Sequence, residues 1–66
     1  MSVVKVIEVL SQSDKSWDDA AQRAIDDAAK SVKNIKSIYI KEMKAEVENN
    51  RITNYQINGK ISFVVG

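Results

Sequence analysis

Residues 54–63 read NYQINGKISF, and this stretch decides the fold. Polar and apolar side chains alternate along it with a period of two, as in a β-strand that buries one face. The expected buried face carries Tyr55, Ile57, Gly59, Ile61, Phe63 and Val65, and the other face carries the polar row Asn54, Gln56, Asn58, Lys60 and Ser62. The polar row is suited to line either a ligand cavity or open solvent, and the pattern alone does not choose between them.

A second strand precedes this stretch and is joined to it by a tight turn. Residues 35–47 show the same period of two, and Glu48-Asn49-Asn50-Arg51 is typical of a hairpin turn because asparagine tolerates the left-handed backbone conformation. We therefore predict an antiparallel hairpin and expect Tyr39 to be a core residue. The expected, mainly apolar face of this strand is Ile35, Ser37, Tyr39, Lys41, Met43, Ala45 and Val47.

Apolar residues at spacings of three and four predict a helix before the hairpin. We expect Ser13 to cap its N-terminus, Asp14 to lie in the first turn, and Lys30 and Lys33 to form a basic end that suits the helix dipole. Because Trp17 belongs to the apolar stripe, we interpret it as a packing residue and not as a surface for ligand stacking. The stripe is Trp17, Ala21, Ala24, Ile25, Ala28, Val32 and Ile35.

The N-terminal segment 3–10 is rich in β-branched residues and predicts a further strand with two apolar faces. In so small a chain the second face needs another subunit or a ligand to cover it. The order strand, helix, strand, strand predicts an α+β fold: one β-α-β-β domain over residues 1–66, in which a three-stranded antiparallel sheet partly wraps one helix.

Composition narrows the possible functions. A chain of 66 residues has a marginal core, and without cysteine or histidine it has no disulfide and no ordinary zinc site, so we expect it to be a homo-oligomer. The net charge of +1, with both signs interleaved, argues against a nucleic-acid partner. The short apolar runs argue against a membrane span or signal peptide, and we expect a cytoplasmic protein.

The residue types present also argue against catalysis and leave metal binding open. Without histidine and cysteine, the common general base and soft nucleophile are missing, and we expect no enzymatic activity. Calcium requires six to eight converging oxygen ligands, and the sequence contains no EF-hand loop. The sequence does not identify the metal ligands. The carboxylates that are candidates in number only are Asp14, Asp18, Asp19, Asp26, Asp27, Glu42, Glu46 and Glu48.

Six short stretches are distributed along nearly the whole chain: Lys5-Val6-Ile7-Glu8-Val9, Ser13-x-x-Ser16-Trp17-x-x-Ala20, Asn34-Ile35, Ile40-Lys41-Glu42, Tyr55-Gln56-Ile57 and Lys60-Ile61-Ser62-Phe63. In this order they resemble the dodecin family of small β-α-β-β proteins. The resemblance implies a hollow homododecameric shell that binds or stores small ligands without transforming them.

The resemblance also implies two ligand-binding positions. In flavin-binding dodecins an aromatic residue at the start of the second strand stacks on the flavin, and a glutamine in a Tyr-Gln pair bonds the ring edge. These positions are Ser37 and Gln56 here. Because serine lacks the stacking surface, worth about 0.5–1.5 kcal/mol beyond burial, we expect flavin (FMN, riboflavin or FAD) to bind weakly. Calcium, associated with dodecin-like proteins that lack the tryptophan, is the alternative ligand, and a purely structural shell without a ligand is a third interpretation.

Overall fold

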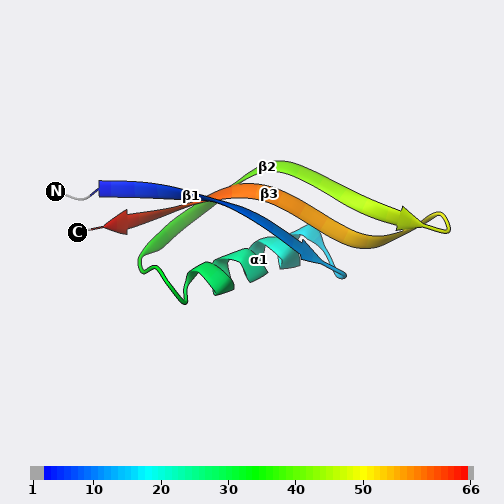
Figure 1. Ribbon diagram of the computed structural model, residues 1–66, viewed down its shortest axis with the longest axis horizontal. Helices are drawn as coiled ribbons and strands as arrows, with labels where there is room; N and C mark the ends of the chain where they lie inside the picture. Colours follow the sequence, from blue (N-terminus) through cyan, green and yellow to red (C-terminus); the bar gives the residue numbers. More distant parts are fainter. Residues whose placement is uncertain (1–2, 66) are drawn as a thin grey trace.

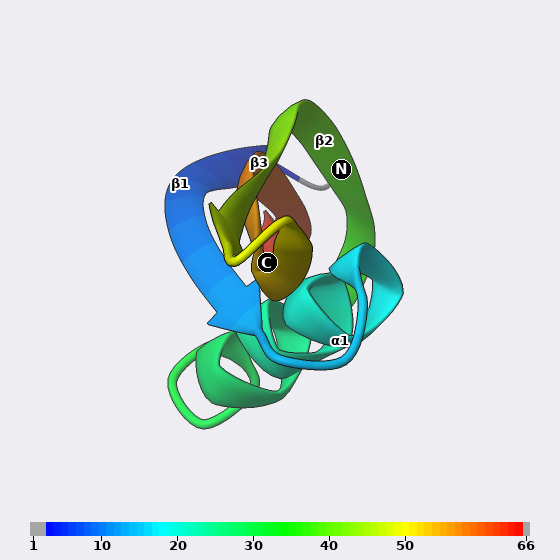
Figure 2. The same ribbon diagram turned by 90° about the vertical axis from the view of Figure 1, so that its right-hand side faces the viewer.

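The computed structural model describes residues 3–65 and contains the predicted order of elements. These are β1 (Val3–Ser13), α1 (Trp17–Ala28), β2 (Ile35–Glu48) and β3 (Arg51–Val65). The sheet order is β1-β3-β2, and both neighbouring pairs are antiparallel. Figure 1 shows α1 lying across one face of this sheet, and Figure 2 shows β1 and β2 on either side of β3. The α+β prediction is confirmed.

The core lies between α1 and the central strand β3. Ile57, Ile61 and Phe63 are buried on β3, opposite the buried Ala20 and Ala24 of the helix. Small alanine side chains allow the helix to approach the sheet closely, and the alternation of β3 directs its apolar residues toward α1. The predicted division of β3 into an apolar and a polar face is therefore confirmed.

The helix begins three residues later than predicted. Ser16, and not Ser13, is the N-cap: its Oγ accepts a hydrogen bond from the backbone N–H of Asp19 at 3.0 Å, and Asp18 and Asp19 form the acidic first turn. Ser13 ends β1 instead, where its buried hydroxyl accepts from the Lys15 N–H at 2.9 Å. Two serines three residues apart are each followed by an aspartate within two residues, so the local capping pattern alone did not distinguish them.

The helix also ends earlier than the apolar stripe predicted. Its last residue is Ala28, so Lys30, Lys33 and Val32 follow the helix, and its last turn carries no basic residue. Asn34 has a φ of 61° and redirects the chain into β2. The expected basic C-terminal end of the helix is therefore wrong.

A register shift in β2 corrects the prediction for Tyr39. The pairing of β2 with β3 shifts between Ile35 and Ser37, so Ile38 and Ile40, and not Tyr39, pair with the helix-facing residues Ile61 and Gly59. A β-bulge moves every later side chain to the opposite face of the strand. Tyr39 consequently lies on the face away from α1, where it is 65% exposed, and its assignment to the core is wrong.

The β2–β3 hairpin extends well beyond the helix. Its turn residues Asn49 and Asn50 have φ angles of 53° and 62°, which confirms the predicted left-handed turn. The 12 residues of α1 span about 18 Å, whereas the 15 residues of β3 span about 50 Å. The chain is accordingly elongated, with extents of 52 × 20 × 13 Å, and the hairpin tip projects away from α1 (Figure 1).

Candidate functional site

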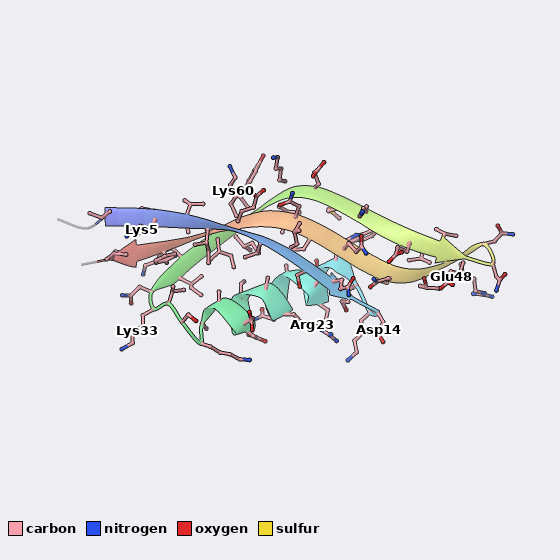
Figure 3. The ribbon with its side chains drawn as sticks, viewed as in Figure 1. Lys5, Asp14, Arg23, Lys33, Glu48 and Lys60 are labelled. Carbon is pink, nitrogen blue, oxygen red and sulfur yellow. The ribbon has the colours of Figure 1, made fainter. Side chains whose placement is uncertain are left out.

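The face of the sheet turned away from α1, called here the outer face, carries the candidate site. Since Ile57, Gly59, Ile61 and Phe63 are directed toward the helix, the alternate β3 residues face outward, and directly paired residues on β1 and β2 share that face. Figure 3 shows the Lys60 side chain pointing away from α1. The predicted polar row of β3 thus runs along the middle of the outer face.

A groove of about 760 Å³, the outer groove, crosses this face. Two cross-strand rows form it, because Leu10 and Glu42 both pair with Asn58, and Gln12 and Lys44 both pair with Gln56. Three further lining residues are Ser11, Met43 and Ile57. The groove therefore draws on all three strands and combines an exposed apolar side chain with amides, a carboxylate and a lysine.

Gln56 is held by a network of amide and carboxylate groups. Its Nε2 donates to Glu46 Oε1 at 2.9 Å and to Gln12 Oε1 at 3.4 Å. The neighbouring Asn54 Nδ2 donates to the same two oxygens, at 3.2 Å and 3.0 Å. These bonds fix the orientation of the Gln56 side chain across three strands, which suits a residue that positions a ligand.

Ser37 lies on the same outer face, although far from Gln56 within one chain. Its partner in register is Ser62, and the two hydroxyls are hydrogen-bonded. Ser62 and Gln56 are six residues apart on β3, which corresponds to roughly 20 Å along the strand. A single subunit therefore does not bring the two predicted ligand residues together, and one small ligand contacts both only when subunits share it.

The helix side supports the groove from beneath. Trp17 Nε1 donates to the backbone oxygen of Lys44 at 2.9 Å, and the Trp17 ring packs edge to face against Tyr55 with centroids 4.9 Å apart. Trp17 thus packs below the sheet and ties α1 to the part of β2 that lines the groove. Its interpretation as a packing residue agrees with these contacts.

A polar cluster secures the connection from β1 to α1. The Ser13 hydroxyl donates to Asp19 Oδ2 at 2.6 Å, and Arg23 Nε donates to the same oxygen at 2.8 Å. The Ser13 hydrogen bond, together with Arg23, lowers the pKa of the Asp19 carboxyl below its ordinary value. Arg23 also lies 4.0 Å from Asp14 (Figure 3). Since each of these side chains has a hydrogen-bond or ion-pair partner within the cluster, we assign the cluster a structural role.

The described residues form no ready-made metal centre. Over residues 3–65, no three carboxylates gather closely enough to hold an ion. In the same range, no helix is long and apolar enough to cross a membrane. Any calcium site must therefore combine carboxylates with neutral oxygen ligands, or ligands from more than one subunit.

Sequence reasoning missed most of the residues that line the groove beside Gln56. Leu10 and Gln12 are about 45 residues from Gln56 in the chain and meet it only through the β1–β3 register. A second register shift in β2, between Ile40 and Glu42, makes Glu42 and Lys44 face outward beside Asn58 and Gln56. The sequence did contain one sign of this bulge. The spacing of two between apolar residues of β2 is interrupted between Ile40 and Met43, which are three residues apart, as expected when a bulge adds one residue to a strand.

Comparison with known proteins places these features in context. The family model described as Dodecin matches residues 3–66. The calcium dodecin of Mycobacterium tuberculosis is 35% identical over 63 residues, covering 96% of this chain and 89% of that protein. Its crystal structure, described as having a calcium-binding site, superposes with a TM-score of 0.79 at 34% identity, covering 92% and 87% of the two chains. A mutant of the Thermus thermophilus dodecin has the same fold, with a TM-score of 0.92 at 21% identity and coverage of 100% and 98%.

Proposed function

This chain belongs to the dodecin family, and on that basis we propose that it is a non-enzymatic protein that binds or stores a small ligand in a closed shell of twelve identical subunits. The unit of the shell is the single domain of residues 1–66. The ligand we favour is a divalent cation such as calcium, and flavin is the second candidate.

Large apolar side chains left exposed on both faces of the sheet are the observation that carries the proposal. Among residues 3–65, the large apolar side chains that are buried are Ile57, Ile61 and Phe63, and only Ile61 is completely enclosed. Many more large apolar side chains are exposed: Val3, Val4, Val6, Leu10, Tyr39, Met43, Val47, Ile52 and Val65. So small a core gives a subunit marginal stability, and burial of the exposed set against other copies supplies what the core lacks.

The groups that line the groove support binding over catalysis. The chain contains no histidine or cysteine, and the Glu46 carboxylate beside Gln56 is occupied by two amide donors. These hydrogen bonds use Glu46 Oε1 to orient the Asn54 and Gln56 amides, which is a structural role for this oxygen. The lining is suited to hold a ligand in one orientation.

Calcium is favoured by the donor atoms and by the relative. The outer face offers carboxylate and amide oxygens, which are the ligands that calcium prefers. The M. tuberculosis relative, 35% identical over almost the whole chain, is a calcium dodecin. Ser37 provides no aromatic surface on which a flavin ring could stack, which disfavours the second candidate.

Flavin stays a candidate because of Gln56. Its side chain is oriented by two hydrogen bonds and lines the groove. A side chain that forms a hydrogen bond to the edge of a flavin ring needs a fixed orientation of this kind. Two equivalent outer faces brought together by the shell would complete such a site.

The test is a titration with both ligands. With calcium we expect a higher melting temperature of the native assembly, reversed by EDTA, because a ligand that binds only the folded state stabilises it. With flavin we expect slight fluorescence quenching, which deepens in Ser37→Trp. A melting temperature indifferent to calcium and EDTA would refute the calcium proposal, and tight flavin binding by the native protein would refute our account of Ser37. If the shell binds neither calcium nor flavin and mass spectrometry detects no bound small molecule, the protein is an empty structural assembly.

A further inference from the structure

The tip of the β2–β3 hairpin presents an exposed apolar pair. Val47 and Ile52 are neighbours in register beside the turn, and they are 60% and 50% exposed. The tip projects away from α1, so the helix of the same subunit does not cover this pair (Figure 1). Aliphatic side chains gathered at the end of such a projection are typical of a contact with another molecule.

A second groove, called here the side groove, lies between β1 and α1 and has a volume of about 440 Å³. Its apolar lining comes from Ile7 and Val9 on β1, Ala24 and Ala28 on α1, and Val32 after the helix. Ala24 is buried and the other four are half-buried. Because the helix contributes only small apolar side chains here, branched side chains from another molecule have room to enter.

Opposite charges border both surfaces at a matching spacing. Glu48 and Arg51 pair in register at the hairpin tip, with Cα atoms about 5 Å apart. Arg23 and Asp27 line the side groove, and residues four apart on a helix lie about 6 Å apart. Glu48 can therefore face Arg23 across a contact. In the same arrangement Arg51 faces Asp27.

These charged groups are available for new ion pairs. In the described part of the chain, Glu48 and Arg51 form no ion pair. Arg23 donates Nε to a carboxylate of its own helix and keeps further N–H donors in its guanidinium group. Asp27 pairs with Lys30 at 3.6 Å on the exposed surface, where an ion pair contributes little and is readily exchanged.

The surface area of one subunit leaves room for a contact of this kind. Its accessible surface is 5012 Å², whereas a compact chain of 7.4 kDa exposes about 4200 Å². The surplus is close to the ~800 Å² that each partner contributes to a stable interface.

We infer that the hairpin tip of one subunit inserts into the side groove of another copy of this chain. Glu48 lies at the hairpin tip, well away from Arg23 of the same subunit, so a second copy must supply the tip (Figure 3). Because tip and groove are different surfaces, each subunit gives one contact and receives another, and such contacts close into rings. The inference rests on the proposed closed shell and assigns residues to one of its contacts.

A designed cysteine pair tests the contact directly, because the chain contains no cysteine of its own. In Ile52→Cys/Ala28→Cys, the tip of one subunit brings its cysteine to the groove cysteine of the next. After mild oxidation of the native-like assembly, we expect a ladder of covalent dimers, trimers and larger species on a non-reducing denaturing gel. The control is Ile52→Cys/Gln22→Cys, whose helix position does not line the groove, and we expect no ladder from it.

Charge reversal tests the same contact without a crosslink. In light scattering over a dilution series, Asp27→Arg and Arg51→Glu should each dissociate at a concentration raised about fivefold or more. The double variant Asp27→Arg/Arg51→Glu should recover the native profile. Asp26→Arg/Arg51→Glu is the matched control and should stay weakened, because Asp26 does not line the groove.

The native mass separates failure of this inference from failure of the proposed shell. A native assembly with the mass of the shell, combined with covalent species no larger than dimers or with no recovery in the double reversal, would overturn the inference and leave the shell standing. A monomeric native protein would overturn both.

Discussion

Replacing Val6 with threonine tests whether the outer face is buried between subunits. Val6 is 56% exposed in a single chain and pairs with Ser62 on the outer face, so it contributes little to the core beneath α1. Valine and threonine have nearly the same shape and both favour strands. In a solvated position the change should alter the free energy of unfolding by less than about 0.5 kcal/mol.

In a subunit interface the added hydroxyl loses its water without gaining a partner, at a cost of roughly 1–3 kcal/mol. This corresponds to association that is weaker by about fivefold to about 150-fold at each copy of the contact. Size-exclusion chromatography with light scattering over a dilution series should show Val6→Thr dissociating at higher concentration than the native protein. Val9→Thr on the helix-facing side is the comparison, because its effect on unfolding should not depend on concentration. An unchanged dilution profile for Val6→Thr would refute burial of the outer face at this position.

Three further changes test the fold that supports the groove. In Gly59→Ala the new Cβ would lie 2.7 Å from the backbone oxygen of Tyr39, so we expect a loss of about 1–3 kcal/mol in chemical denaturation. Trp17→Phe removes the donor to the Lys44 oxygen and should cost about 0.5–1.5 kcal/mol, read from the same assay. Because the folded pKa of Asp19 lies below 3.8, its ionised form stabilises the protein at higher pH, and this contribution is lost as pH falls below 3.8 through the folded pKa. The stability difference between native and Asp19→Asn should therefore be constant near neutral pH and shrink in acid; a constant difference throughout would contradict the assigned hydrogen bonds.

The sequence predicted the elements of the fold better than the faces of β2. Alternation along β3 was enough to place Ile57 and Ile61 in the core and Gln56 outside it, because a regular strand has a fixed period of two. The register shift between Ile35 and Ser37 breaks that period in β2, and Tyr39 was consequently assigned to the wrong face.

The residues that form the groove could not be predicted from local sequence patterns, because they come together only through contacts between strands. Gln56 was identified through resemblance to a family, whereas its partners Gln12 and Glu46 come from two other strands and meet it only in the folded sheet. Whether Ser37 and Gln56 contact one ligand depends on how subunits meet, and it stays a prediction.

The mass of the native protein in solution tests the central proposal most directly. Light scattering at micromolar concentration should give twelve times the 7.4 kDa of one chain, because the exposed apolar side chains of the sheet require other copies to cover them. The mass should persist on moderate dilution. A mass of 7.4 kDa at the same concentration would contradict the proposal of a closed shell.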